Sequence, residues 1–308
     1  MPRKARLIIP GEIHHVMARG IDGHAIFAYS SDKERFVSLL GKYLGNSGCL
    51  CYAWAVMDNH YHLLLRPLDL DLTIIMRRLN SAYARYYNLT YSRKGYVFQD
   101  RYKSLATQEY WYFRELIRYI HLNPIRASII SSMKELDQYE WTGHKTIINE
   151  KRHDWIAVRE VLSKFGKTIK DARISYKKHI EAGIGLVENG WSFPSESENE
   201  KDSDERVAGE ASFVKTAVKK IERELQKKRE MVQNRKSLDA LANEVCENYG
   251  ITLNALLSRG RLDNRSRARK KFCGDAVKLY GYSGKEVAAY MGVNPGCVSR
   301  MVYRIQCD

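Results

Sequence analysis

Apolar and polar positions in the first part of the chain follow two periods, one typical of strands and one typical of helices. Alternating residues or short apolar runs between turn residues predict strands at 12–19, 50–57, 60–65 and about 104–107. Apolar residues three and four positions apart predict helices at 30–44, 72–89 and 110–122. The order β-α-β-β-α-β, followed by a helix, fits a ferredoxin-like antiparallel sheet with helices on one face. We therefore expect an α+β domain over residues 1–145.

The pattern weakens beyond this domain. Helices are expected at 154–164 and 168–182. A polar, acidic stretch near 195–206 has no aromatic residue and is typical of an exposed linker. We expect residues 146–228 to form a helical connector and residues 229–308 to form a second, all-α domain.

The last domain has the pattern of two short helices joined by a tight turn. Ser283 and Glu286 have the spacing of a capping box that begins one helix, and Gly292 marks the turn after it. Asn294 can cap the next helix, with Pro295 at its first position. A short helix, a glycine turn and a short helix together predict a helix-turn-helix.

A basic segment at 262–271 precedes these helices, and this end of the chain resembles the DNA-binding domain of bacterial replication initiators. The residues expected to reach base edges or phosphates of duplex DNA are Asn294, Ser299 and Arg300. A helical hairpin that contacts another protein is the alternative.

Composition narrows the classes of function. The chain has 51 Lys and Arg against 36 Asp and Glu, and its net charge of +15 favours a polyanionic partner. No apolar run approaches the length of a membrane span, and residues 1–6 lack the apolar core of a signal peptide. The six cysteines form no CxxC pair and no disulfide-like framework, which disfavours a zinc finger. We therefore expect a cytoplasmic, nucleoid-associated protein without a membrane partner.

The first candidate chemistry lies in the strand expected at 60–65. Side chains of a strand alternate between two faces, so His60 and His62 share one face and Tyr61 lies on the other. Two imidazoles side by side on a rigid strand make half of a metal site. The alternative is a pair of histidines that only fill hydrogen bonds or face solvent.

The second candidate chemistry lies at the end of the helix expected at 110–122. Tyr119 and Asn123 are four positions apart and lie on one face of that helix, one turn from each other. A phenol for nucleophilic attack and an amide oxygen for a third metal ligand would thus come as one unit. Asn123 could instead be a helix C-cap before Pro124, and Tyr119 could be a packing residue.

A histidine pair on a strand, followed by a helix that ends in Tyr-Ile-x-x-Asn-Pro-Ile-x-Ala, resembles the single-tyrosine HUH transposases. Within them, the chain most resembles the REP-associated tyrosine transposases. The resemblance includes the segments 14–20 and 97–104, and it covers residues 1–145 in the order of motifs that the family shows. It implies the same ferredoxin-like fold.

The resemblance also implies a reaction, in which single-stranded DNA is cleaved by phosphoryl transfer to tyrosine. Tyr119 would be the nucleophile and would form a 5′-phosphotyrosine, while His60, His62 and Asn123 would hold a divalent cation. Nitrogen and oxygen ligands with open positions suit Mg²⁺ or Mn²⁺, although imidazole also binds zinc well. The DNA is expected to be a hairpin or a repeat.

Basic residues interleave with tyrosines in the first domain, as they do in single-strand binding sites. Candidates for contact with DNA phosphates are Arg77, Arg78, Arg85, Arg101 and Lys103. The tyrosines among them are Tyr86, Tyr91, Tyr96 and Tyr102. An ordinary solvated surface is the alternative for most of these charges.

Two other functions fit the same sequence. A sequence-specific DNA-binding regulator would keep the charge and the helix-turn-helix but would need no Tyr119. A metal-dependent hydrolase would use His60 and His62 with water and would form no covalent adduct. Dimerisation is open, and in dimeric relatives the tyrosine helix can serve the partner's site.

Overall fold

The computed structural model describes residues 8, 11–45, 47–68, 72–107, 109–149, 153–188, 207–208, 235–258 and 263–304, with six single positions between 216 and 233. The expected acidic linker near 195–206 lies outside the described residues. Contacts divide the chain into two units, residues 1–218 and residues 219–308, and each is described by itself.

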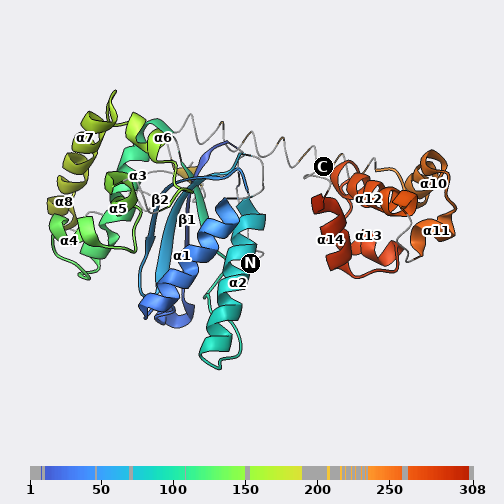
Figure 1. The fold of residues 1–308 in the computed structure, drawn as a ribbon, viewed down its shortest axis with the longest axis horizontal. Helices are drawn as coiled ribbons and strands as arrows, with labels where there is room; N and C mark the ends of the chain where they lie inside the picture. The colour runs from blue at the N-terminus through green and yellow to red at the C-terminus, as the bar shows by residue number, and fades with distance from the viewer. Residues whose placement is uncertain are drawn as a thin grey trace. The chain divides into compact units, whose positions relative to one another are not determined.

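The first unit is built on an antiparallel sheet with the strand order β2-β3-β1-β4 (Figure 1). Its strands are β1 (Ile13–Arg19), β2 (Leu50–Val56), β3 (His60–Arg66) and β4 (Lys103–Thr107). A two-residue strand, β5 (Val207–Ala208), pairs in parallel with the outer edge of β4. This order, with β1 and β3 in the centre, confirms the predicted ferredoxin-like α+β fold.

Helices cover both faces of the sheet, because both faces of its central strands carry apolar side chains. Helices α1 (Ser30–Leu44) and α2 (Leu72–Thr90) pack on the face of Tyr61 and Leu63. Helix α3 (Glu109–Arg126) packs on the opposite face, where Leu64 lies. The expectation of helices on one face is therefore right for α1 and α2 and wrong for α3.

Helix α3 continues through Pro124, where the sequence had suggested its end. Proline has no N–H to donate to the carbonyl of Ile120, four residues earlier. The side-chain amide of Asn123 donates to that carbonyl at 3.4 Å and to the Tyr119 carbonyl at 2.9 Å. Asn123 therefore lies inside the helix rather than at its C-cap, and its Nδ2 group compensates for the missing backbone donor.

Five helices follow α3 among the described residues up to 188. They are α4 (Met133–Gln138), α5 (His144–Asn149), α6 (Val158–Ser163), α7 (Ile169–Glu181) and α8 (Ile184–Glu188). The buried side chains of α6 and α7 share one apolar core with α3. Part of the segment expected to be a connector thus packs into the first unit.

A buried chain of polar groups joins these helices to α3. Asp137 Oδ1 lies 3.0 Å from His144 Nε2, His144 Nδ1 lies 2.9 Å from the Tyr176 hydroxyl, and that hydroxyl lies 2.8 Å from His121 Nδ1. The carboxylate accepts from His144 Nε2, so Nδ1 must accept from Tyr176, whose oxygen then accepts from His121. This order holds α3 in one position relative to α5 and α7.

The second unit is helical over its described residues. It contains α10 (Leu238–Tyr249), α11 (Leu253–Leu257), α12 (Asp263–Lys278), α13 (Gly284–Tyr290) and α14 (Pro295–Arg304). The capping box expected at the start of α13 is present, since Glu286 N donates to Ser283 Oγ and Ser283 N donates to Glu286. Gly292, with φ of 61°, makes the turn before α14. Among the described helices of the whole chain, none is long and apolar enough to cross a membrane.

Candidate active site

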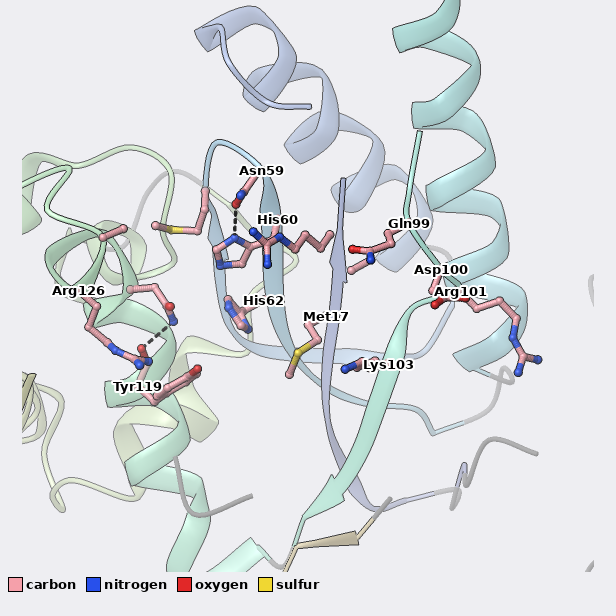
Figure 2. A pocket seen from close by; sticks show the side chains of 15 residues that line it. Met17, Asn59, His60, His62, Gln99, Asp100, Arg101, Lys103, Tyr119 and Arg126 are labelled. Carbon is pink, nitrogen blue, oxygen red and sulfur yellow. Dashed lines mark hydrogen bonds between the residues drawn. The ribbon is translucent and has the colours of Figure 1, made fainter. Parts of the chain in front are cut away.

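A cavity of about 640 Å³ lies between α3 and one end of the sheet (Figure 2). Strands β1, β3 and β4, the turn before β3, the segment 99–101 and the last turns of α3 contribute to its wall. The side chains that matter for chemistry are His60, His62, Tyr119 and Asn123, and all four line it. The strand pair and the helix predicted separately from the sequence thus meet at one cavity.

The hydrogen bonds around His60 determine which of its nitrogens can bind a metal. Asn59 donates its Nδ2 group to the carbonyl of Gly23 at 3.2 Å, so its Oδ1 must face the other way. That Oδ1 lies 2.6 Å from His60 Nδ1, which therefore carries the proton. Burial, assisted by Arg19, lowers the pKa of His60 to about 4. At neutral pH, His60 is thus neutral with a lone pair on Nε2.

His62 is held by a second histidine that the sequence analysis did not assign. Nδ1 of His62 lies 3.0 Å from Nε2 of His15, and the two rings stack with centroids 5.1 Å apart. Burial lowers the pKa of His62 well below its usual value and that of His15 to about 4, so both are neutral. If His62 Nδ1 donates to His15, Nε2 of His62 keeps its lone pair for a ligand.

Tyr119 projects from α3 toward the sheet, on the side of His62 and Met17 (Figure 2). Its ring centroid lies 5.8 Å from that of His62 and 5.9 Å from that of His15, and both ring pairs meet edge to face. The guanidinium of Arg126 lies 4.6 Å from the centre of the phenol ring. A cation there is attracted to the ring face and can also contact a phosphate.

The amide orientation of Asn123 suits a role as ligand. Its Nδ2 group faces two backbone carbonyls of α3, which can only accept hydrogen bonds. Oδ1 is therefore the atom that remains for a cation, and the side chain lines the cavity. The same geometry that allows α3 to pass Pro124 thus orients a ligand oxygen.

The donor set of two neutral imidazoles and one amide oxygen fits a divalent cation that also takes phosphate oxygens or water. Within the part of the chain that the structure describes, no group of three or more His, Cys, Asp or Glu side chains is arranged to hold a metal. A third protein ligand at this cavity would therefore be of another type, and Asn123 is one such side chain in its wall.

The charged residues in the cavity wall are mostly basic. Four basic residues line it against one acidic residue, Asp100, and the basic ones are Arg19, Arg101, Lys103 and Arg126. Arg101 and Lys103 were candidates from the sequence, whereas Arg19 and Arg126 were not. Net positive charge in a cleft attracts a polyanion such as a nucleic acid backbone.

The other predicted DNA contacts do not line this cavity. Arg77 and Arg85 are exposed and Arg78 is half-buried on α2, which packs on the other face of the sheet. In the second unit, Asn294 Oδ1 accepts from Gly296 N at the start of α14, and Ser299 donates to the Pro295 carbonyl. Arg300 is exposed on the same helix.

The sequence analysis missed His15, Asn59 and Arg126. No signal in the sequence alone placed His15, because its position depends on the register in which β1 pairs with β3: Met17 faces His62, and His15 has the same parity as Met17. Arg126 lies seven positions after Tyr119, two turns further along α3 on nearly the same side. The expected helix end at Pro124 removed Arg126 from consideration.

The comparisons with known proteins concern the first unit. Residues 12–123 match the family model described as IS200-like transposase, and no curated protein matches the sequence. One similar solved structure is described as a REP-associated tyrosine transposase bound to a REP hairpin. It has 16% sequence identity and a TM-score of 0.40, and the likeness covers 51% of this chain and 92% of that chain. The family match confirms the resemblance expected from the motifs: strands β1 to β4 and the histidine, tyrosine and asparagine side chains of the cavity lie in a segment that matches the IS200-like transposases.

Proposed function

We propose that the first unit is a metal-dependent single-stranded DNA endonuclease and strand transferase that forms a 5′-phosphotyrosine. The observation that supports this proposal best is the meeting of Tyr119 with His60, His62 and Asn123 at one basic cavity. Residues 12–123 match a transposase family, which agrees with DNA as the substrate. A single chain supplies all four side chains, so the proposed site needs no residue from a second copy.

His60 Nε2, His62 Nε2 and Asn123 Oδ1 would hold Mg²⁺ or Mn²⁺ in this proposal. Such a cation, when bound, binds a non-bridging phosphate oxygen and neutralises charge that develops during attack. The phenol oxygen of Tyr119 forms a bond to phosphorus, and the bond from phosphorus to the 3′ oxygen breaks. The phenol proton leaves to solvent, and the released 3′ oxygen takes up a proton. The ester energy remains in the phosphotyrosine bond, so a 3′-hydroxyl can rejoin the strand by the reverse step.

The basic residues of the cavity position the DNA backbone. Arg126 lies over the Tyr119 ring and can pair with a phosphate oxygen next to the cut. Lys103 and Arg101 lie across the cavity from α3, on β4 and the segment before it (Figure 2). A DNA strand that passes between these two residues and α3 would bring one of its phosphates to Tyr119.

The second unit would bind duplex DNA through α13 and α14. A capped first helix, a glycine turn and an exposed second helix support this part of the proposal. Arg300 is exposed on α14 and free of the capping role that Asn294 has. Substitution of Arg300 by Ala should weaken duplex binding without changing cleavage of single strands.

An adduct gel tests the proposal. The full chain is incubated with a labelled single-stranded DNA hairpin and Mn²⁺, and the products are separated after denaturation. A covalent adduct that disappears in Tyr119→Phe and in His62→Ala, and that chelation of the metal prevents, is the expected result. Cleavage that survives Tyr119→Phe would instead indicate a hydrolase that uses water. Binding without cleavage would indicate a DNA-binding regulator.

A further inference from the structure

A tyrosine array lies where α1 begins and α2 ends, and it consists of exposed Tyr29 and half-buried Tyr87 and Tyr91. Tyr29 and Tyr91 are nearly parallel, with an interplanar angle of 20° and ring centroids 6.2 Å apart. Tyr91 in turn contacts Tyr87, with centroids 4.6 Å apart. Tyr29 is 62% exposed, so most of this large ring has no cover within the described part of the chain. The exposed face of the Tyr29 ring is thus available to stack against a ligand.

The array is held rigid from below. Asp32 is fully buried, and its two carboxylate oxygens accept from the hydroxyls of Tyr91 at 2.8 Å and Tyr86 at 3.1 Å. The hydroxyl of Tyr91 is thus fixed on the inner side, and its ring face is left to stack. A preorganised aromatic surface loses little conformational entropy when a ligand binds to it.

Cations accompany the tyrosines. The guanidinium of Arg93 lies 5.6 Å from the ring centre of Tyr87, and that of Arg35 lies 5.7 Å from the ring centre of Tyr86. Aromatic faces with cations beside them are the combination that binds single-stranded nucleic acid, since bases stack and phosphates pair with the charges. These charges would not contribute to the binding of a wholly apolar partner.

The array is connected to the cavity by two segments that run beside each other. Gln99 N donates to the Arg19 carbonyl at 2.9 Å, and Ile21 N donates to the Val97 carbonyl at 3.0 Å. Arg19 and Gln99 line the cavity, and the chain that leaves Arg19 reaches Tyr29 at the start of α1. Both features therefore lie at the same end of the sheet.

We propose that Tyr29, backed by Tyr91, stacks an unpaired base of the DNA strand that flanks the cleavage site. This inference rests on the proposed function, because the cavity defines where the strand is cut. The ring face of Tyr29 supplies affinity and position without reading the base sequence, because every base has a π face. The site sets where the single-stranded flank leaves the protein.

An abasic scan tests the inference. The full chain carrying Tyr119→Phe, which cannot form the adduct, is titrated with labelled hairpin DNA that has single-stranded flanks. Each flank nucleotide is replaced in turn by an abasic one, and binding is followed by fluorescence anisotropy. One flank position should lose about fivefold or more in affinity, the size of a stacked base. Adding Tyr29→Ala should cause the same loss with intact DNA and should remove the sensitivity at that one position.

Two further variants control the test. Tyr29→Phe keeps the ring and should behave as the parent, which shows that the fold and the stacking face remain. Leu89→Ala removes another exposed apolar side chain, 72% exposed at the end of α2, and should leave the scan unchanged.

Equal affinity of the Tyr29→Ala protein and its parent for intact DNA, or an equal loss at every abasic position, would overturn the inference. If no abasic position changes the affinity while the protein with Tyr119 still forms the adduct, only the stacking site is refuted. If affinity falls at one abasic position but no adduct forms under any condition, the proposed reaction is refuted and the stacking site is supported. A Tyr29→Ala protein that binds DNA normally but loses a protein partner would assign the array to protein contact instead.

Discussion

The hydrogen bond between His15 and His62 predicts that His15 controls metal affinity although it is not itself a proposed ligand. His62 can ligate through Nε2 only if Nδ1 carries the proton and donates it to His15 Nε2, 3.0 Å away. In His15→Met that acceptor is lost, and the ligating tautomer leaves a buried donor unsatisfied, at a cost of about 1–3 kcal/mol. The other tautomer places its proton on Nε2, where the metal should bind. Mn²⁺ affinity should therefore fall by about 5- to 150-fold.

His15→Gln is the matched variant, because Gln has a size similar to Met and can accept through Oε1. Mn²⁺ binding to both variants, measured by titration calorimetry in the Tyr119→Phe background, separates the hydrogen bond from the loss of the ring. Affinity should follow the order wild type, Gln, Met. His14→Gln changes a buried histidine whose Nδ1 bonds Ser104 and which does not line the cavity, so its affinity should be unchanged. Equal binding by His15→Met and His15→Gln would refute the tautomer argument.

Two predictions concern the stability of the first unit, which tryptophan fluorescence follows specifically because all five tryptophans precede residue 219. A Cβ on Gly41 would lie 2.6 Å from Trp155 Nε1, which is too close for the two atoms to fit without a shift. Gly41→Ala should therefore destabilise the first unit by about 1–3 kcal/mol. Helix propensity alone would predict the opposite, because alanine stabilises a helix interior by about 1 kcal/mol relative to glycine. Ser38→Ala, exposed on the same helix, is the control, and an unchanged urea midpoint for Gly41→Ala would contradict the prediction. Burial lowers the pKa of His121 and His144 below the value of about 6.5 of an unfolded chain, so the unfolded state binds more protons below that pH. The free energy of unfolding should therefore be highest above about pH 6.5 and should fall as the pH is lowered, by up to about 1.4 kcal/mol per pH unit for each histidine. Equal urea midpoints at about pH 7.5 and 5.5 would contradict this prediction.

Local patterns predicted the elements of the first unit well, because each depends on a short-range period. The strand of His60 and His62 and the helix of Tyr119 were expected within a few residues of their bounds. The alternation of faces on β3 is confirmed, since Tyr61 packs with α1 and α2 while His62 lies at the cavity. The predicted end of α3 was wrong, because the rule that proline ends a helix considers only the backbone. Here the side-chain amide of Asn123 donates to the Ile120 carbonyl in place of the N–H that Pro124 lacks.

The long-range features could not be obtained in the same way. His15 meets His62 only because β1 and β3 pair in one particular register, and sequence alternation does not fix a register between strands far apart. The array of Tyr29 and Tyr91 joins the start of one helix to the end of another. The sequence named Tyr91 as a base-stacking candidate but had no means to find Tyr29 as its neighbour.

One sign of the position of α3 was nevertheless available in the strand itself. Leu64 has the same parity as His60 and His62, and an apolar residue on that face implies that the face is covered as well. In the structure Leu64 is fully buried in the core that α3 shares, and it is the next residue after His62 on that face of β3. A strand that is apolar on both faces and carries two histidines at one end thus indicates more than a sheet with one layer of helices. It indicates a second helix layer, and in the structure the last turns of α3 face the two histidines across the cavity.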